Sequence, residues 1–370
     1  MNRLGVFVFY DKEGIADRYV FYLLKALHKS FTKLIIVVNG FINDESLSQM
    51  KSFSDDIFIR ENKGYDAGAY KDVFAYYISA HELKAYDQIV LFNDSIFGPL
   101  CSMENMWTFF ERNDMDFGGI TKHPFFFDDG GNSFPSHIQS YFLVVNNKMF
   151  TSRLFTDFWC DMSYPVTLYD AVSDFELKFT DYFEKAGFVG KTLISELKYD
   201  GNPYGLYIKE LIQNYDMPFF KTKCLAFTNP RYFDAIDAVK YIEKKSDYNT
   251  KLIWEHIYRE CYKFDFSVPF SYAELQTFYE KHMHCYIYGN GQYGKVIQAY
   301  FLYRNWNIKG VVVSDGQIQD GNEIYYSDVE LDKNDGIIVA LGKKNLGQVI
   351  NQISKDLGKD QMLLPRFIAK

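Results

Sequence analysis

Short apolar runs alternate with segments of helical periodicity through the N-terminal part of this chain. Runs rich in β-forming residues predict strands at 4–10, 34–38, 56–60, 87–92, 115–120 and 138–145. Apolar residues at helical spacing predict helices between these runs, at 14–31 and 67–80. Strands that alternate with helices form a mostly parallel sheet covered on both faces, so the predicted fold class is α/β. Ligands of such sheets bind at the carboxyl ends of the strands.

The composition is that of a globular protein with more than one domain. The chain has 370 residues, 48% hydrophobic and 24% charged, and about 150 residues per domain predicts two or three domains. A net charge of −8 argues against broad nucleic-acid binding, which needs clustered Lys and Arg. Five cysteines without a C-x-x-C pair favour a reducing, cytoplasmic location, and no apolar run is long enough to span a membrane. The aromatic share of 19% predicts a Phe-rich core and leaves room for surfaces that stack on sugar or base rings.

A glycine-rich segment follows the third predicted strand and opens a helix. Its candidate ligand-binding residues are Asn62, Gly64, Tyr65, Asp66 and Gly68. The glycines remove side chains where a backbone would approach a ligand, and a helix N-terminus favours anionic groups. The alternative is purely structural, with Asp66 as the N-cap of the helix.

A polar turn, Asn93-Asp94-Ser95, ends the fourth predicted strand. A carboxylate there suits an enzyme of nucleotide sugars, because Mg²⁺ or Mn²⁺ is usually held by one or two carboxylates together with phosphate oxygens. The same three residues are also ordinary turn formers. The glycine-rich segment lies one strand away in the same predicted sheet, and this pairing favours the ligand-binding interpretation.

Two further segments carry candidate catalytic or binding side chains. Asp174 and Glu176 stand near the predicted start of a helix over 172–186 and do not share one face of it, so only one is expected to point into a site. Helix capping is the alternative for this pair. Alternation along a strand places His137 on one face with Gln139 and Tyr141. His137 is a candidate for metal or diphosphate binding, with a structural hydrogen bond as the alternative.

The C-terminal part begins a new strand–turn–helix–strand unit. Gly289, Gly291 and Gly294 form a G-x-G-x-x-G pattern, and Asp315 ends the next strand at the spacing of a ribose-binding acid. The unit is about half the size of a full dinucleotide-binding fold. We therefore expect a small Rossmann-type module in which packing or partner contact is favoured over binding of NAD or another nucleotide.

Several segments together resemble the rhamnan-synthesis F family of polysaccharide biosynthesis proteins, over roughly residues 1–265. They are NKGYDAGAYKDV (62–73), FNDSIFGPL (92–100), HIQSYFLV (137–144), FTDFWCDM (155–162), FELKFTDYFEKAGF (175–188) and YIKELIQNYDMPFFK (207–221). The resemblance implies a GT-A-like glycosyltransferase domain at 1–230. A helical extension at 231–282 and a Rossmann-like module at 283–370 would follow it.

The resemblance also implies roles for the candidate residues. The glycine-rich segment would lie beside a nucleotide-sugar donor, either dTDP-rhamnose or a UDP-sugar such as UDP-galactofuranose. Asn93-Asp94-Ser95 would replace the Asp-x-Asp motif of GT-A enzymes, with Asp94 as the remaining ligand of Mn²⁺ or Mg²⁺. Glu176 would occupy the position of the catalytic base of an inverting enzyme, with Asp174 as the fallback.

The acceptor implied by the resemblance is a growing, lipid-linked polysaccharide at the inner face of the cell membrane, and contact with that membrane would be peripheral. A homo-oligomer is compatible with the sequence. Two alternatives stay open. One is a non-catalytic scaffold subunit of a glycan-synthesis complex, and the other is an NAD-dependent oxidoreductase that works through the C-terminal module.

Overall fold

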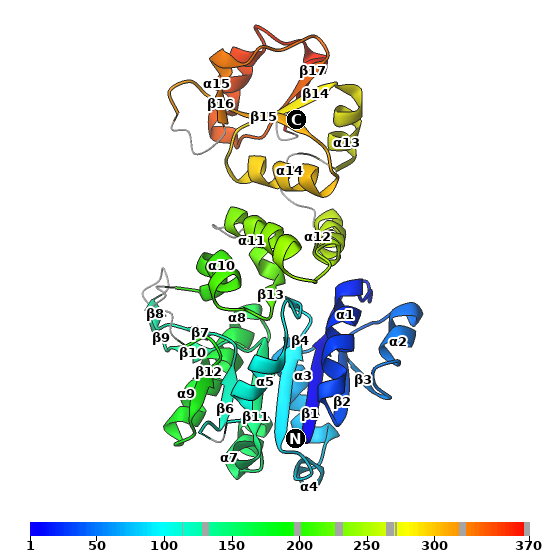
Figure 1. Ribbon diagram of the computed structural model, residues 1–370, viewed down its shortest axis with the longest axis vertical. Helices are drawn as coiled ribbons and strands as arrows, with labels where there is room; N and C mark the ends of the chain where they lie inside the picture. Colours follow the sequence, from blue (N-terminus) through cyan, green and yellow to red (C-terminus); the bar gives the residue numbers. More distant parts are fainter. Residues whose placement is uncertain are drawn as a thin grey trace. The chain divides into compact units, whose positions relative to one another are not determined.

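The computed structural model describes residues 1–112, 114–127, 133–195, 201–225, 232–263, 270, 272–317 and 323–365 (Figure 1). The chain divides into two units, Met1–Ile253 and Trp254–Lys370. None of the described helices combines the length and hydrophobicity that a membrane crossing requires.

A mixed, mainly parallel sheet forms the centre of the first unit. In the described residues its order is β12-β6-β11-β4-β1-β2-β3. These strands are β1 (Arg3–Phe9), β2 (Lys33–Asn39), β3 (Asp56–Arg60), β4 (Gln88–Asn93), β6 (Phe117–Gly119), β11 (Phe142–Asn146) and β12 (Gly190–Thr192). Strand β11 runs antiparallel to both of its neighbours, and the other pairs are parallel. The predicted α/β class is confirmed.

Helices cover both faces of this sheet (Figure 1). The helices of the first unit are α1 (Arg18–Leu27), α2 (Asp44–Met50), α3 (Tyr65–Asp72), α4 (Ala80–Leu83), α5 (Glu104–Phe110), α6 (Asn147–Phe150), α7 (Arg153–Asp161), α8 (Leu168–Ala171), α9 (Lys178–Lys185), α10 (Pro203–Asn214) and α11 (Tyr232–Lys245). Helix α12 (Lys251–Lys263) begins in the first unit and continues into the second. Short 3-10 turns occur at His28–Ser30 and Thr222–Leu225.

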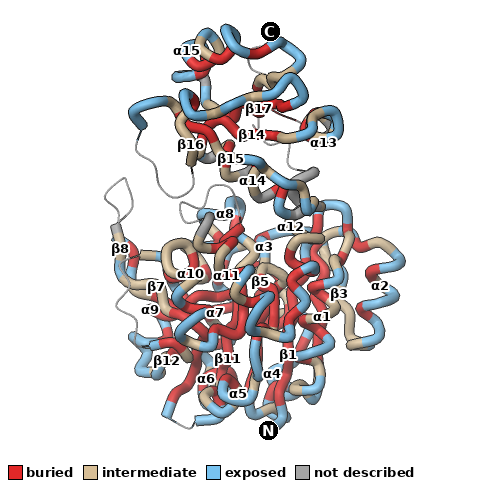
Figure 2. The backbone as a smooth tube through the Cα atoms, turned by 45° about the horizontal axis from the view of Figure 1, so that its top comes forward, coloured by how far each residue is buried: buried red, intermediate tan, exposed pale blue. Residues whose placement is uncertain are grey.

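Aromatic rings dominate the core on one face of the sheet, as the composition predicts. Trp159 of α7 is fully buried and lies against Tyr70 of α3 and against Phe175 and Phe179. These rings pack with aliphatic residues of β1, β2, β4 and β11 in one cluster (Figure 2). Removing one such ring costs about 3–5 kcal/mol, so this cluster fixes α3, α7 and α9 on the sheet.

Several local predictions need correction. The predicted strand 138–145 is two strands, because β10 (His137–Ile138) pairs with β7 (Lys122–His123) and β11 begins only at Phe142. The predicted helix 67–80 ends in a π-helical turn at Val73–Tyr77, and Ser79 caps a new helix. The gap between the predicted strands 115–120 and 138–145 contains β7 and a pair formed by β8 (Phe126–Phe127) and β9 (Ser133–Phe134), while 128–132 lies outside the described residues.

The helix that carries Asp174 and Glu176 also begins earlier than expected. Thr167 caps α8, and both acids lie in a π-helical turn, Val172–Leu177, between α8 and α9. The alternative that these two acids cap the start of a helix is therefore wrong. Their two-residue separation places them on different faces of this turn.

The second unit has a parallel sheet of order β16-β15-β14-β17-β18 in its described residues. Its elements are α13 (Tyr272–Lys281), β14 (His284–Tyr288), α14 (Gln292–Tyr303), β15 (Ile308–Val313), β16 (Glu323–Tyr325), β17 (Asp335–Val339), α15 (Lys343–Ile353) and β18 (Met362–Leu363), with 3-10 turns at Tyr326–Asp328 and Lys359–Gln361. Two separate hydrophobic clusters pack against this sheet. The predicted Rossmann-like α/β class is confirmed for this unit.

Candidate active site

The carboxyl ends of the parallel strands bring the two predicted ligand segments together. The Asn93 side chain at the end of β4 donates from Nδ2 to Oδ2 of Asp66, at 2.9 Å. Asp94 Oδ2 accepts a hydrogen bond of 3.0 Å from the backbone N–H of Tyr10, which directly follows β1. The glycine-rich segment and the Asn93-Asp94-Ser95 turn thus meet at one edge of the sheet, as parallel strands require.

The two glycines of the glycine-rich segment have structural reasons to be glycine. Gly64 is the N-cap of α3 and has a φ of +80°, where L side chains are strained. A Cβ on Gly68 would lie 2.2 Å from the carbonyl oxygen of Lys63. The side chains of Asn62 and Tyr65 are exposed, and Tyr65 has a left-handed φ of 57°. Backbone conformations of this kind concentrate at functional sites.

Asp66 is not the N-cap that the structural alternative predicts. It lies in the first turn of α3, where its Oδ1 accepts from the N–H of Ala67 at 2.9 Å. Burial raises the pKa of Asp66, and the negative charge of Glu176 acts in the same direction. Both carboxylate oxygens of Asp66 accept hydrogen bonds, one from the Ala67 N–H and one from the Asn93 side chain. The Asp66 carboxylate thereby orients Asn93 at the end of β4.

Asp94 is the most perturbed carboxyl group of this edge. Burial raises its pKa to about 7, and the charges of Asp66 and Asp11 act in the same direction, against the hydrogen bond from Tyr10. Only Oδ2 of Asp94 accepts a hydrogen bond from another described residue. Asp11 follows β1 and was missed by the sequence reasoning, although it is the first acid after the first strand.

The Asn93-Asp94-Ser95 segment is a turn as well as part of this edge. Asn93 Oδ1 accepts from both the N–H and the hydroxyl of Ser95, at 3.1 and 2.5 Å. The Tyr19 hydroxyl donates to the carbonyl oxygen of Asp94 at 2.7 Å. The turn interpretation and the ligand interpretation therefore describe the same geometry, because the turn fixes the direction of the Asp94 side chain.

Glu176 reaches this region from the π-helical turn and is held by residues that precede β11. Its Oε2 accepts from the Ser140 N–H at 3.0 Å and from the Ser140 hydroxyl, and its Oε1 lies 3.5 Å from His137 Nε2. Burial by itself would raise the pKa of Glu176. The hydrogen bond from His137 and the positive charge of Lys221 outweigh burial and lower that pKa to about 2.

The structure places His137 and Asp174 differently from Glu176. His137 is buried, with one ring nitrogen at Glu176 and the other, Nδ1, 2.9 Å from the Pro135 carbonyl oxygen. Asp174 forms an ion pair with Lys178 one turn further along the helix. Of the two acids, the one that joins the group at the strand ends is Glu176.

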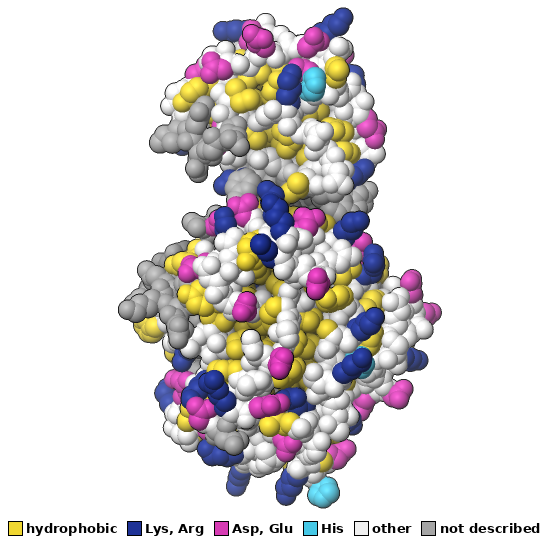
Figure 3. Space-filling model, in the orientation of Figure 1, with side chains coloured by type: hydrophobic (Ala, Val, Ile, Leu, Met, Phe, Trp, Pro, Cys, Tyr) yellow, Lys and Arg dark blue, Asp and Glu magenta, His cyan; other side chains and the backbone are white. Residues whose placement is uncertain are grey.

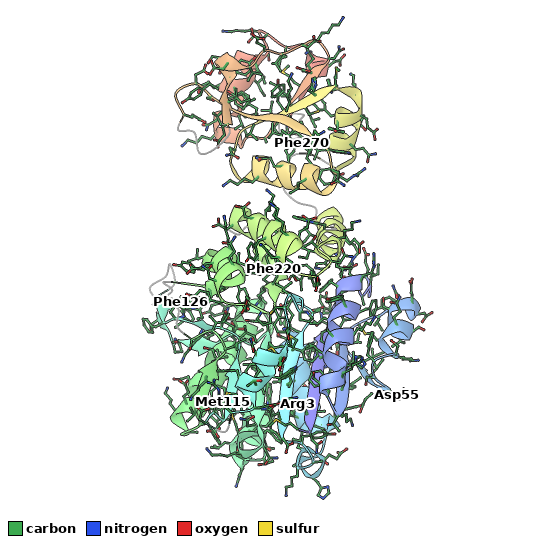
Figure 4. All side chains as sticks on the ribbon, viewed as in Figure 1. Arg3, Asp55, Met115, Phe126, Phe220 and Phe270 are labelled. Atoms are coloured by element: carbon green, nitrogen blue, oxygen red, sulfur yellow. The ribbon has the colours of Figure 1, made fainter. Side chains whose placement is uncertain are left out.

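Two lysines complete the group, and sequence reasoning did not single them out. Lys221 lies on β13 (Phe220–Lys221; Phe220 is labelled in Figure 4), which pairs with β5 (Ile96–Phe97) directly after the Asn93–Ser95 turn. Its charge acts on both Glu176 and Asp66. Burial and the charge of Lys221 lower the pKa of Lys223. Neither lysine forms an ion pair with any described residue. The only sequence signal is a K-x-K pair whose first lysine ends the 207–221 segment.

Two buried hydroxyl groups beside this group have no hydrogen-bond partner among the described residues. They belong to Tyr70, whose pKa is raised by burial and by Asp66 and Asp94, and to Tyr204, whose ring centroid lies 5.8 Å from Lys221 Nζ. A buried hydroxyl without a partner costs about 1–3 kcal/mol. Such atoms in a native fold call for an explanation, and a bound water, ion or ligand is one.

The glycines of the second unit divide into two kinds. Gly289 has a φ of +106°, and a Cβ on Gly294 would lie 1.9 Å from the Gly289 carbonyl oxygen, so the turn itself requires both. A Cβ on Gly291 would meet no atom within 4 Å. Asp315 accepts a hydrogen bond of 3.0 Å from the N–H of Ser327. Of the four predicted nucleotide-binding residues in this unit, only Gly291 has no packing reason for its identity.

Solved structures similar to the chain include the glycosyltransferase GlyE of Streptococcus pneumoniae TIGR4. It has a TM-score of 0.35 and 10% identity, with 99% of this chain and 96% of that chain covered. Core-mannan synthase A of Aspergillus fumigatus, in an Mn/GDP form, has a TM-score of 0.29 and 9% identity, with 42% of this chain and 63% of that chain covered. TM-scores this low do not transfer an activity or a ligand to this chain.

Sequence comparison is more informative. The uncharacterized protein y4gN of Sinorhizobium fredii (strain NBRC 101917 / NGR234) is 22% identical over 188 residues, which make up 50% of this chain and 46% of that protein. The chain thus spans about half the length of the curated relative that it matches. The family model of rhamnan synthesis protein F matches residues 34–287, which is more than half of the chain. The chain therefore belongs to the rhamnan synthesis protein F family.

Proposed function

We propose that this protein is a glycosyltransferase that moves a sugar from a nucleoside-diphosphate donor to a growing cell-surface polysaccharide. One observation carries the proposal. In a chain of the rhamnan synthesis protein F family, half-buried carboxylates gather at the carboxyl edge of the sheet with an ionised glutamate and with two lysines that form no ion pair with any described residue. Diphosphate binding and proton removal need groups of these kinds.

The donor diphosphate would bind beside Lys221 and Lys223, whose positive charges have no ion-pair partner in the described residues. The N-terminus of α3 begins at the same edge, and its free N–H groups favour anionic oxygens. The unpartnered hydroxyls of Tyr70 and Tyr204 would then find acceptors. These groups stabilise the charge that develops on the departing diphosphate.

Asp94 is the residue that would hold Mn²⁺ or Mg²⁺. The described residues contain no group of three or more His, Cys, Asp or Glu side chains that is arranged for a metal ion. One carboxylate with a free oxygen nevertheless fits a cation that takes most of its ligands from phosphate and water. The bound ion would neutralise negative charge on the leaving diphosphate.

Glu176 would act as the general base. It takes the proton of the acceptor hydroxyl while that oxygen attacks the anomeric carbon, and the diphosphate leaves from the opposite face with inversion. A pKa of about 2 makes Glu176 a weak base in the free protein. A diphosphate bound to Lys221 offsets the positive charge that helps lower this pKa, so donor binding strengthens the base.

Membership of a rhamnan synthesis family favours dTDP-rhamnose as the donor. A UDP-sugar such as UDP-galactofuranose carries the same diphosphate and is the second candidate. The acceptor would be a lipid-linked polysaccharide, which the protein would meet at the surface of a membrane. A panel of donors with different nucleotide bases is therefore the appropriate test.

The test measures release of nucleoside diphosphate from dTDP-, UDP- and GDP-sugars with Mn²⁺, for the full chain and for Glu176→Gln. We expect the variant to lose at least about 100-fold in rate, the usual contribution of a positioned base. Asp174→Asn is the matched control, because it removes an acid two residues away that pairs with Lys178 instead, and it should keep wild-type activity. Equal rates for wild type and Glu176→Gln would refute the assigned base. Donor binding without any turnover would favour the scaffold alternative.

A further inference from the structure

A pocket of ≈ 530 Å³ opens at the β6–β12 end of the sheet in the first unit. Basic and hydroxyl side chains contribute to its lining, among them Arg112, Thr121, Lys122, Ser136, Lys191 and Thr192. Figure 3 shows Lys and Arg side chains gathered at this end of the unit, with acidic side chains among them. The roles assigned above to the strand-end group do not use this pocket.

The described lining residues include three cations and no carboxylate. Lys122 lies 3.5 Å from Glu184, and Lys191 pairs with Asp114, but all four of these side chains are more than a third exposed. Exposed ion pairs contribute little free energy, so an anion can replace either acid at small cost. The Arg112 guanidinium lies 5.5 Å from the ring centroid of Phe109, another lining residue, which offers a sugar ring an apolar face.

The wall of the pocket continues into the candidate active site through Thr121. Thr121 is buried, and its Oγ1 lies 2.8 Å from Gln139 Oε1 and 3.0 Å from the Tyr141 hydroxyl. Those two residues flank Ser140, whose N–H and hydroxyl hold Glu176. Thr121 therefore connects the wall of the pocket to the segment that holds the proposed base.

We propose that this pocket binds a saccharide that carries a negative charge, and that this saccharide is part of the acceptor. The inference rests on the proposed function, because an acceptor must place a hydroxyl beside Glu176. The cations of Lys122, Lys191 and Arg112 favour a negatively charged ligand. The hydroxyls of Ser136 and Thr192 donate to the carbonyl oxygens of His123 and Ile194, and their oxygens can still accept hydrogen bonds from sugar hydroxyls. The donor diphosphate has separate cations, Lys221 and Lys223.

The test compares binding of maltose 1-phosphate and of maltose to the full chain by calorimetry. We expect the phosphate to bind more tightly, and Lys191→Met or Arg112→Met to weaken it about tenfold each, the size of one lost charge-assisted hydrogen bond. Lys185→Met is the matched control, since it removes an exposed lysine that pairs with Asp181 on α9. It should bind the phosphate as the wild type does.

The outcomes separate this inference from the proposed function. Equal affinity for maltose and maltose 1-phosphate, no binding of either, or unchanged binding by both pocket variants overturns the inference. Titration of UDP, dTDP and GDP on the same variants should be unaffected. Weaker diphosphate binding by Lys191→Met would make the pocket part of the donor site, which overturns the inference and leaves the proposed function standing. Phosphate-dependent saccharide binding without any diphosphate binding would support the pocket and refute the proposed function.

Discussion

Replacing Asp94 with asparagine is expected to stabilise the first unit against unfolding in metal-free buffer at neutral pH, while it weakens donor binding. Asp94 is half-buried and lies near the negative charges of Asp66 and Asp11. Asparagine keeps an oxygen that accepts the hydrogen bond from the Tyr10 N–H and removes only the charge. The expected gain in the free energy of unfolding equals the amount by which ionised Asp94 destabilises the folded chain.

The size of this gain follows from the pKa of Asp94. A pKa of about 7 in the folded chain, against an ordinary value of 3.8, corresponds to at most about 4 kcal/mol. Below about pH 4 the Asp94 carboxyl is protonated in both the folded and the unfolded chain, so the variant gains nothing there. Above that pH the unfolded chain ionises first, and wild-type stability falls until about pH 7, where the advantage of the variant becomes constant.

Thermal unfolding with EDTA at several pH values between 5 and 8 measures this difference. Asp174→Asn is the control, because Asp174 forms an exposed ion pair with Lys178 and its removal should cost about 0–1 kcal/mol without a pH-dependent gain. A variant Asp94→Asn that is no more stable than the wild type at pH 8 would refute the reasoning. So would a gain that is equally large at pH 5 and pH 8.

Four other substitutions test the remaining structural assignments. Glu176→Gln should destabilise the first unit by about 3 kcal/mol at pH 7 in urea unfolding, because the Glu176 pKa of about 2 is lower than its ordinary 4.5. The difference from wild type should shrink as pH falls from about 4.5 toward 2, where the wild type loses this contribution. Gly68→Ala should lower the melting temperature of the first unit strongly, because its Cβ would lie 2.2 Å from the Lys63 carbonyl oxygen; an unchanged melting temperature would contradict the geometry of that turn. In the second unit, Gly294→Ala should disrupt folding, since its Cβ would lie 1.9 Å from the Gly289 carbonyl oxygen, whereas Gly291→Ala should leave the free energy of unfolding within about 1 kcal/mol of wild type. Gly291 is therefore the position at which to test nucleotide binding by this unit.

The strands were the most predictable part of the fold. Continuous apolar runs such as 4–10 and 34–38 are long enough to signal a buried strand, and they lie on β1 and β2. The meeting of Asp66 with Asn93 also followed from the sequence, because parallel strands place their carboxyl ends along one edge.

The local corrections come from tertiary packing. The π-helical turn Val172–Leu177 inserts into a pattern that looks like one regular helix, and Phe175 within it packs on Trp159 and Tyr70. The break between β10 and β11 leaves Ser140 outside both strands, with its N–H free to bond to Glu176. Neither feature has a local sequence signal.

The missed site residues share one property, which is that their role depends on distant partners. Lys221 reaches the site because β13 pairs with β5, more than a hundred residues earlier in the chain. A lone lysine after two phenylalanines does not indicate this contact. The sequence shows Asp11 only as one acid in a loop. The pairing of β1 with β4 is what brings it near Asp94.

The central claim is that the strand-end group of the first unit binds a nucleoside diphosphate. Calorimetric titration of the full chain with UDP, dTDP, GDP and NAD, each with and without Mn²⁺, tests it most directly. We predict that one diphosphate binds, that Mn²⁺ strengthens its binding, and that Asp94→Asn or Lys221→Met weakens it about tenfold or more. If none of the diphosphates binds, or if only NAD binds, the claim that the strand-end group binds a nucleoside diphosphate is contradicted.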